Sequence, residues 1–393
     1  MLYQLEGSQA VARAVALCRP NVVCAYPITP QTHIVEGLGE LVHSKQLENC
    51  AYMNVESEMG AISAVIGSEA AGVRSYTATS SQGLLYMIEA VYNASGLDLP
   101  IVMTLGNRAI GSPINIWNDH ADAMAARDAG WLMVFAESNQ EAVDLHIQAF
   151  KIAEAVKCPI MVCVDGFILT HAYEQVDIPS QEEVDKFLPP YKPEVYLNEK
   201  NPVSIGAMVS PTEFMEVRYL EHKKQIKALD IIANIGEEFA KQFGRNSGGL
   251  IRQYNVDDAD VVIVAMGSVL GTIKDTIDEL NAEGNEKFGV LSIVTYRPFP
   301  AEAIAKVLQN KKKVIVVEKA FALGRGGILF QEIELALKGT NVKVTSVIAG
   351  IGGRNITMSL LKESFKKDDD VTFLGLNHEI IREEEQRLAE CNN

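Results

Sequence analysis

The chain has 393 residues, of which 48% are hydrophobic and 22% are charged, ordinary values for a globular protein with two or three domains. Its formal net charge of −16 at pH 7 argues against a surface for nucleic acid or an anionic membrane, because either would repel the chain as a whole. The N-terminus lacks a basic segment followed by an apolar run, and no window reaches the roughly 18 apolar residues of a membrane-spanning helix. We therefore expect a cytoplasmic protein.

The first 170 residues alternate apolar strands with segments of helical period. The expected strands are 21–26, 73–77, 99–105, 131–135 and 159–164, and one expected helix covers 141–156. Alternation of this kind predicts a mainly parallel sheet with helices on both faces. We place a first domain at residues 1–175.

Residues 176–211 interrupt this pattern with six prolines, which fix the backbone and remove hydrogen-bond donors, so we expect an extended connector. The run Ser210-Pro-Thr-Glu213 has the features of a helix start, with Ser at the cap and Glu three residues later. A long polar helix should follow towards Ala240 and end by Gly244. This connector and helix make up residues 176–255.

The remaining residues, 256–393, predict a second α/β domain. Its expected strands are 261–265, 288–294, 313–317 and 342–347, and its expected helices are 272–280, 300–309 and 327–337.

The loop Tyr26-Pro-Ile-Thr-Pro30 follows the first expected strand, at the edge where open parallel sheets bind ligands. Its two prolines keep the loop rigid and would hold the Thr29 hydroxyl in one place, as a positioned donor requires. An ordinary strand-to-helix turn is the alternative.

Glu58 lies in a segment of unusually small residues that runs to Ala71. A flat ring or another backbone could approach such a segment closely. An acid there would lose hydration, which favours its protonated, hydrogen-bond-donating form. Glu56 and Glu69 are alternative candidates, and a surface helix with three solvated acids is a further alternative.

Arg108 follows another apolar strand, so it too should lie at the ligand-binding edge. The planar fork of arginine suits bidentate capture of a carboxylate. The alternative is a structural ion pair with Asp119 or Asp122.

Two further motifs carry weaker signals. His120 could be a general base or a hydrogen-bonded loop histidine. Gly324-Arg-Gly-Gly327 could receive an anion at a helix start, but it lacks the spacing of dinucleotide and Walker motifs, and tight packing explains its glycines as well. The six cysteines form no CxxC pair, so we expect neither an iron–sulfur cluster nor a structural metal in this chain.

Several of these motifs resemble, in the same order, those of the alpha subunits of pyruvate:ferredoxin oxidoreductases, within the wider 2-oxoacid:ferredoxin oxidoreductase family. The matching segments are Tyr26–Pro30, Ser57–Gly60, Ser81–Leu84, Asn107–Ile110, Asn115–His120, Tyr296–Pro300 and Gly350–Arg354. They span nearly the whole chain. The resemblance implies an N-terminal domain that binds the pyrimidine side of thiamine diphosphate and a C-terminal domain similar to the C-terminal domain of transketolase.

The resemblance also implies oxidative decarboxylation of a 2-oxoacid with coenzyme A, with electrons passing through iron–sulfur clusters to ferredoxin. Glu58 would hydrogen-bond the aminopyrimidine ring of thiamine diphosphate, and this bond favours the tautomer that can accept the thiazolium proton. Thr29 and Arg108 would hold the substrate carboxylate and the neighbouring oxygen, and Thr29 also counts among the coenzyme-contacting residues.

Pyruvate is the expected substrate, because Thr29 with Arg108 suits a small monocarboxylate, and the product would be acetyl-CoA. The same chemistry on a branched 2-oxoacid, 2-oxoglutarate or oxalate is the nearest alternative. A non-catalytic assembly subunit is an alternative of another class.

One half of the expected site is missing from the sequence. Thiamine diphosphate enzymes normally hold Mg²⁺ and the diphosphate through Gly-Asp-Gly followed by Asn-Asn. This chain has no Gly-Asp-Gly, and its single Asn-Asn is the terminal Asn392-Asn393. We expect beta, gamma and delta-type subunits to supply Mg²⁺ and the [4Fe-4S] clusters. Ferredoxin should dock on one of them, because this acidic chain would repel an acidic partner.

Overall fold

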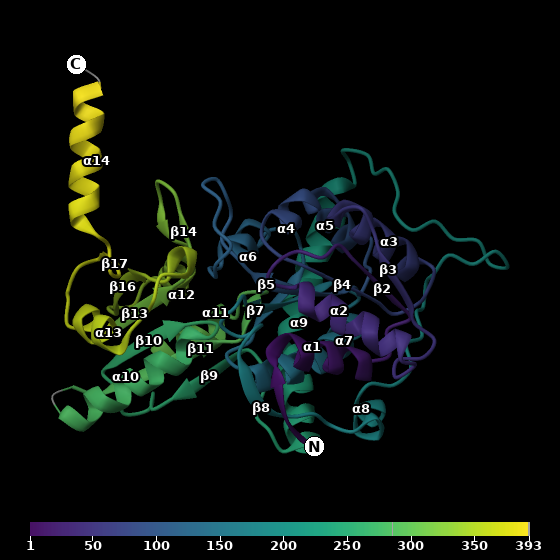
Figure 1. The fold of residues 1–393 in the computed structure, drawn as a ribbon, viewed down its shortest axis with the longest axis horizontal. Helices are drawn as coiled ribbons and strands as arrows, with labels where there is room; N and C mark the ends of the chain where they lie inside the picture. The colour runs from purple at the N-terminus through teal and green to yellow at the C-terminus, as the bar shows by residue number, and fades with distance from the viewer. Residues whose placement is uncertain (285, 392–393) are drawn as a thin grey trace.

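The structure is a computed structural model that describes residues 1–284 and 286–391. The terminal Asn392-Asn393 pair lies outside the described residues. Two sheets, each flanked by helices, form the two halves of the molecule (Figure 1). Among the described residues, no helix combines the length and the hydropathy that crossing a bilayer requires.

A seven-stranded sheet forms the centre of the N-terminal half, in the order β12-β6-β7-β5-β4-β2-β3. Its strands are β2 (Val22–Ala25), β3 (Ala51–Asn54), β4 (Ser75–Thr79), β5 (Val102–Asn107), β6 (Leu132–Phe135), β7 (Ile160–Asp165) and β12 (Thr295–Arg297). Neighbours pair in parallel except β12, which runs antiparallel to β6. Every residue of β4, β5 and β7 is buried, as expected for central strands covered on both faces.

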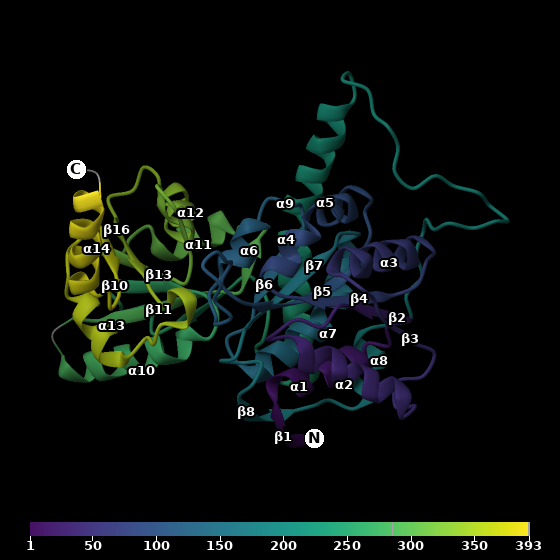
Figure 2. The same cartoon turned by 45° about the horizontal axis from the view of Figure 1, so that its top comes forward.

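Helices cover both faces of this sheet, as the sequence predicts (Figure 2). One face carries α1 (Gly7–Leu17), α2 (Thr32–His43) and α7 (Asn139–Val156). The other face carries α3 (Glu58–Ala70), α4 (Gln82–Tyr86), α5 (Ile88–Gly96) and α6 (Ala121–Ala125).

The proline-rich segment is more structured than the sequence predicts. Strand β8 (Tyr173–Asp177) pairs antiparallel with β1 (Leu2–Glu6). Helix α8 (Gln181–Phe187) follows, started by a capping box between Ser180 and Glu183. The expected extended connector is therefore wrong for 181–187, which is helical, and holds for the irregular stretch 188–210.

The long polar helix is confirmed as α9 (Phe214–Phe243). It begins later than expected, because the Ser210 hydroxyl bonds the Glu213 carboxylate and a turn, not the helix, occupies 211–213. It ends at Gly244, which adopts φ 69° as helix-terminating glycines do.

A six-stranded sheet centres the C-terminal half, in the order β17-β16-β13-β10-β11-β9. Its strands are β9 (Ile251–Tyr254), β10 (Val261–Ala265), β11 (Phe288–Ile293), β13 (Lys313–Glu318), β16 (Lys343–Ile348) and β17 (Val371–Phe373). One face packs on α10 (Val269–Glu283) and α13 (Met358–Phe365), and the other on α11 (Ala301–Leu308) and α12 (Ile328–Ala336). The hairpin strands β14 (Phe321–Ala322) and β15 (Gly326–Gly327), the short turn η1 (Ile351–Gly353) and the exposed helix α14 (His378–Cys391) complete this half.

One of the hydrophobic clusters contains buried side chains from both halves of the molecule. A single cluster of buried side chains runs from α3 and α5 through the edge of the first sheet to β10, β11 and α12. Strand β12 takes part directly, because it leaves the C-terminal half to pair with β6. The Tyr296–Pro300 motif therefore lies at the junction of the halves, with Tyr296 fully buried.

Candidate active site

The Tyr26–Pro30 loop leaves the carboxyl end of β2 and is tied to the next strand by Gln31. The buried Gln31 amide donates to the carbonyl of Tyr26 at 2.8 Å and to that of Ala78 in β4 at 3.1 Å. Thr29 itself is exposed, and its hydroxyl makes no hydrogen bond to any described residue. The loop is held against the sheet while the Thr29 hydroxyl stays available.

Glu58 is the first residue of α3, which Ser57 caps by accepting a hydrogen bond from the Gly60 N–H at 3.1 Å. The Glu58 side chain packs on Gly83, where an added Cβ would lie 2.7 Å from Glu58 Oε1. Only 7% of Glu58 is exposed, and within the described residues no hydrogen bond or ion pair reaches its carboxylate. A buried acid in this state is poorly hydrated and keeps its hydrogen-bonding capacity for a ligand.

The two alternative acids of this segment are placed differently from Glu58. Glu56 is exposed at the helix start. Glu69 is buried, but its carboxylate accepts a hydrogen bond from the Ser75 N–H at 2.9 Å, and burial raises its pKa well above the usual value. The alternative of a surface helix with three solvated acids is therefore wrong.

Arg108 follows β5, and its guanidinium reaches across to the Thr29 loop. Its Nη1 donates to the carbonyl of Thr29 at 2.9 Å, and its Nη2 lies 3.4 Å from Gln82 Oε1. In the described part of the chain the guanidinium contacts no carboxylate, so the alternative of a structural ion pair with Asp119 or Asp122 is wrong. Burial lowers the Arg108 pKa, opposed by the nearby Asp122, and the group remains cationic at neutral pH. It is a buried cation that an anionic ligand could neutralise.

The start of α4 joins the two sides of this site. Gly83 lies under the Glu58 carboxylate, and the preceding Gln82 accepts from Arg108. Ser81 adopts φ 50° and ψ −123°, a strained conformation for a residue with a Cβ. Thr29, Glu58 and Arg108 thus surround one short turn at the carboxyl edge of the sheet.

Asp122 is the residue of this region whose place the sequence does not predict. Its Oδ2 accepts from the backbone N–H groups of Ser81 and Arg108, each at 3.0 Å, and its Oδ1 accepts from the Asn107 side chain at 3.0 Å. Burial raises the pKa of Asp122 to about 7, while these three donors act in the opposite direction. The sequence suggested a partner for the Arg108 guanidinium, whereas the carboxylate binds the Arg108 backbone.

His120 is a hydrogen-bonded structural histidine, which was the second of the two interpretations that the sequence left open. It is fully buried, and its Nε2 lies 2.7 Å from Asp165 Oδ1. Asp165 also accepts from Lys319 Nζ at 2.9 Å and from the Ser268 N–H at 3.0 Å at the start of α10. Burial alone would raise the Asp165 pKa, but Lys319, His120 and Ser268 hold it well below its usual value. This network joins the two halves of the molecule.

Two of the segments that resemble family motifs, Asn115–His120 and Gly350–Arg354, pack on each other beside that network. The Asn115 side chain donates to the Gly352 carbonyl at 3.1 Å, and the Gly352 N–H donates to Asp119 at 3.0 Å. Gly352 has φ 60°, and a Cβ there would lie 2.6 Å from the Asn115 amide. A cavity of about 1090 Å³ lies here, between the halves, and not at Glu58.

The Gly324–Gly327 segment does not present a free anion site. It forms the β14–β15 hairpin, and helix α12 begins at Ile328. The first N–H groups of α12, from Ile328 and Leu329, donate to the Glu318 carboxylate at 2.8 Å each. Burial raises the Glu318 pKa to about 7. An acid of the chain therefore takes the position that a bound anion would occupy. The packing explanation holds for Gly327, whose added Cβ would meet Glu318 and Ser346, but not for Gly324 and Gly326, which have open space around them and adopt positive φ angles.

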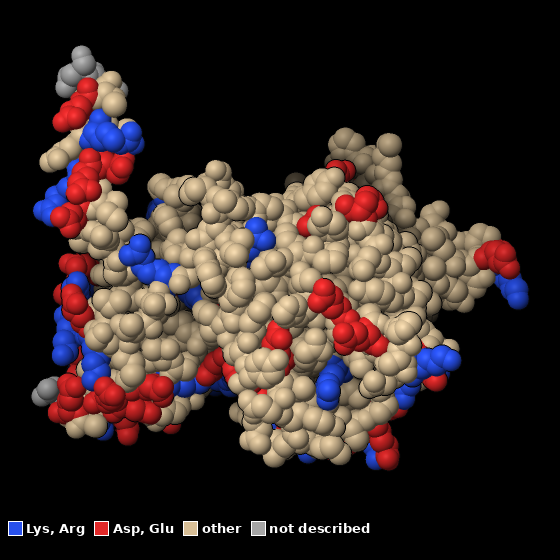
Figure 3. Space-filling model, in the orientation of Figure 1, with Lys and Arg blue, Asp and Glu red and all other residues tan. Residues whose placement is uncertain are grey.

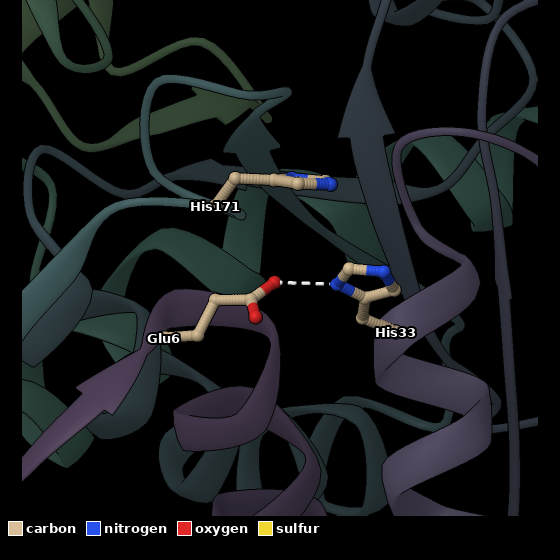
Figure 4. Close-up of side chains that lie close together, drawn as sticks. All are labelled: Glu6, His33 and His171. Atoms are coloured by element: carbon tan, nitrogen blue, oxygen red, sulfur yellow. Dashed lines mark hydrogen bonds and ion pairs between the residues drawn. The ribbon is translucent and has the colours of Figure 1, made fainter.

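One group of ligand-type side chains lies apart from these residues, at Glu6, His33 and His171 (Figure 4). His33 Nδ1 lies 2.6 Å from Glu6 Oε1, and the rings of His33 and His171 lie 4.9 Å apart at a 36° tilt. His171 Nδ1 contacts Thr170 Oγ1 at 2.7 Å. A cation would have to displace the Glu6–His33 contact, so these contacts describe a hydrogen-bonded group with two tilted rings in contact.

Comparison with known proteins identifies the family. Residues 13–237 match the family described as pyruvate flavodoxin/ferredoxin oxidoreductase, thiamine diphosphate-binding, and residues 259–361 match pyruvate:ferredoxin oxidoreductase core domain II. The pyruvate synthase subunit PorA of Methanosarcina barkeri is 47% identical over 380 residues, which are 95% of this chain and 94% of that protein. The chain belongs to the pyruvate:ferredoxin oxidoreductase family.

Other relatives within and beside this family are similar over most of their length. The pyruvate synthase subunit PorA of Methanocaldococcus jannaschii is 46% identical over 95% of this chain and 97% of that protein. The ketoisovalerate oxidoreductase subunit VorA of Pyrococcus horikoshii is 41% identical over 92% of this chain and 93% of that protein. A solved 2-oxoglutarate:ferredoxin oxidoreductase from Magnetococcus marinus matches with a TM-score of 0.70 and 19% identity, over 93% of this chain and 65% of that one, which supports the fold.

The described residues of this pyruvate:ferredoxin oxidoreductase family member fit the ring side of thiamine diphosphate. Glu58 is a buried carboxylate without a partner, and the hydroxyl of Thr79, beside Gly83, is likewise buried without a hydrogen bond. The lack of a side chain at Gly83 leaves the space that Glu58 occupies. The diphosphate side has no counterpart, since the sequence contains no Gly-Asp-Gly.

Proposed function

We propose that this chain is the alpha-type subunit of a pyruvate:ferredoxin oxidoreductase. The complex would decarboxylate pyruvate oxidatively with coenzyme A to acetyl-CoA and CO₂, and pass the electrons to ferredoxin through clusters of its partner subunits. The observation that carries the proposal is the buried, unpartnered Glu58 carboxylate beside a buried Arg108 that no described carboxylate neutralises. A coenzyme ring and a substrate anion are the two ligands that this pair requires.

Glu58 would hold the coenzyme by its aminopyrimidine ring. When bound, thiamine diphosphate supplies a nucleophilic carbon for attack on the 2-oxo group. Glu58 would share a proton with a ring nitrogen, and a bound ring that displaces water from this buried residue would strengthen the hydrogen bond. The Glu58 carboxylate packs against Gly83, which limits its movement.

Arg108 and Thr29 would hold the substrate. The Arg108 guanidinium is fixed by the Thr29 carbonyl and by Gln82, so its remaining N–H groups point in a set direction and can bind a carboxylate. Its Nε is buried and has no hydrogen-bond partner among the described residues. The free Thr29 hydroxyl could donate to the neighbouring oxygen. Described residues offer no second cation here, which favours a monocarboxylate over a dicarboxylate.

A partner subunit would complete this site. Several apolar side chains around this site are exposed to solvent, as is typical of a surface that another protein covers. They are Tyr26, Tyr86, Ile114, Ile116 and Trp117. The face over α4, α5 and α6 carries few charged side chains, whereas acids gather over α10 and both signs along α14 (Figure 3). Beta-type subunits would bring Mg²⁺ and the diphosphate grip, and gamma and delta-type subunits with [4Fe-4S] clusters would dock ferredoxin. We place the complex in the cytoplasm.

The isolated chain should bind thiamine diphosphate poorly, because it holds only the ring side of the coenzyme. Isothermal titration calorimetry with Mg²⁺ present should show no tight binding to the purified chain and clear binding to the complex co-purified from the native source. Tight, Mg²⁺-dependent binding by the lone chain would contradict the shared site.

The co-purified complex should turn over pyruvate faster, in kcat/KM, than any other 2-oxoacid. A panel of pyruvate, 2-oxobutyrate, 2-oxoisovalerate, 2-oxoglutarate and oxalate, with coenzyme A and a viologen or ferredoxin acceptor, measures this directly. The similarity to VorA makes 2-oxoisovalerate the main competitor. A higher kcat/KM for 2-oxoisovalerate would reassign the substrate, and no turnover of any acid would favour the assembly role.

A further inference from the structure

Asp122 connects the parts of the site that handle different ligands. It accepts the N–H of Ser81, the residue just before Gln82 and Gly83, and the N–H of Arg108 on the same carboxylate oxygen. Gly83 supports Glu58, and Gln82 contacts the Arg108 guanidinium. One carboxylate oxygen therefore holds both the turn under the coenzyme acid and the strand end that carries the substrate cation.

The contacts around Ser81 show why this acceptor matters. At φ 50° Ser81 lies in a region that residues with a Cβ rarely adopt, so the turn needs contacts that hold it there. Asp122 bonds its N–H, and its hydroxyl donates to the Ala109 carbonyl on the Arg108 side. Without an acceptor at Asp122, the turn is free to relax away from Glu58.

Asp122 cannot act on a ligand directly. Its side chain is fully buried, and its second oxygen is occupied by the Asn107 amide and by the Ala123 N–H at 2.8 Å. Any effect of Asp122 on turnover must pass through the residues that it holds.

We propose that Asp122 is a positioning residue that fixes Arg108 and the Ser81–Gly83 turn in one geometry and so couples substrate binding to coenzyme binding. The inference rests on the proposed function, because Arg108 and Glu58 have their roles there. Asparagine at this position keeps the shape but replaces one acceptor oxygen with an NH₂ group, which would face N–H donors.

The test uses the complete complex, carrying Asp122→Asn, Asp122→Glu or the matched control Asp119→Asn. Asp119 is also a buried loop acid that accepts two backbone N–H groups, but those belong to Ala121 and Gly352 and not to the site loops. Each variant is assayed for the KM of pyruvate, the KM of coenzyme A, the thiamine diphosphate concentration that half-saturates the apo-complex, and the melting temperature.

Asp122→Asn should raise the pyruvate KM by at least about tenfold and should also raise the half-saturating coenzyme concentration, because buried N–H groups lose their acceptor. Asp122→Glu should shift both constants in the same direction. The coenzyme A KM should not change, and Asp119→Asn should leave all three constants near those of the wild type. In an Arg108→Ala background, Asp122→Asn should add little to the pyruvate KM, since its effect on the substrate passes through Arg108.

Three results would overturn the role of Asp122. They are unchanged constants in an assembled Asp122 variant, a full additive effect on the pyruvate KM in the Arg108→Ala background, or failure of both Asp122 variants to assemble while Asp119→Asn assembles. The last result would assign Asp122 to folding alone. A wild-type complex that turns over no 2-oxoacid would instead overturn the proposed function, so the two failures are distinguishable.

Discussion

Glu58→Gln should lower kcat for pyruvate by about 10²–10⁴-fold, the range that loss of a positioned acid–base group produces. Glutamine fills almost the same volume over Gly83, so the fold and the assembly of the subunits should be unaffected. It cannot exchange a proton with a ring nitrogen, which is the part that the buried, unpartnered carboxylate would play. Steady-state assays of the complex, with size-exclusion chromatography to verify assembly, measure both quantities.

Glu56→Gln is the matched control, because Glu56 is an acid two residues earlier that is exposed at the helix start. It should leave kcat within about twofold of the wild type, as most exposed substitutions do little. Near-normal turnover by Glu58→Gln would remove Glu58 from the mechanism. Equal losses in both variants would point to a general effect on the start of α3.

Arg108→Ala should raise the KM for pyruvate by about 10- to 150-fold, the equivalent of losing a hydrogen bond to a charged group worth about 1.5–3 kcal/mol. Arg108→Lys should give a smaller increase, because lysine keeps the charge but cannot offer the planar fork. The KM for coenzyme A should change little in either variant. Initial rates over a range of pyruvate concentrations provide these constants.

Arg127→Ala serves as the control for removal of a nearby arginine, since the Arg127 guanidinium donates to the Met124 carbonyl within its own turn. It should leave the pyruvate KM unchanged. If Arg108→Ala also left the pyruvate KM unchanged, Arg108 would be a structural residue that braces the Thr29 loop.

The sequence predicted the central strands well because their physical signal is local. Strand β10 occupies the expected residues 261–265, an unbroken run of buried apolar side chains that begins after Asp260. Strand β3 at 51–54 was not predicted, because it lies at a sheet edge, is mostly exposed and so lacks such a run. Helix α8 was hidden by the neighbouring prolines, although the Ser180–Glu183 capping box was a readable signal.

The sequence predicted that Thr29 and Arg108 lie at one edge of the sheet, because each follows a predicted strand and the carboxyl ends of parallel strands meet there. Glu58 follows the unpredicted strand β3, so its place beside them was not predictable from strand positions, and the roles of all three residues stay predictions. The hydrogen-bond partners of Asp122 and His120 could not be predicted from the sequence. Asp122 binds backbone N–H groups, which leave no trace in side-chain patterns, and the Lys319 that meets the His120–Asp165 pair lies 154 residues beyond Asp165.

The position of strand β12 limits where the polypeptide can be truncated. Its three residues close the outer edge of the first sheet, although they follow the first three strands of the second sheet, β9, β10 and β11, in the chain. A truncated polypeptide that stops before residue 295 would leave β6 with unpaired backbone groups. An exposed edge strand of this kind can pair with strands of other chains and cause aggregation. The segment that matches a coenzyme-binding domain is therefore not an autonomous module, and its solubility depends on amino acids translated much later.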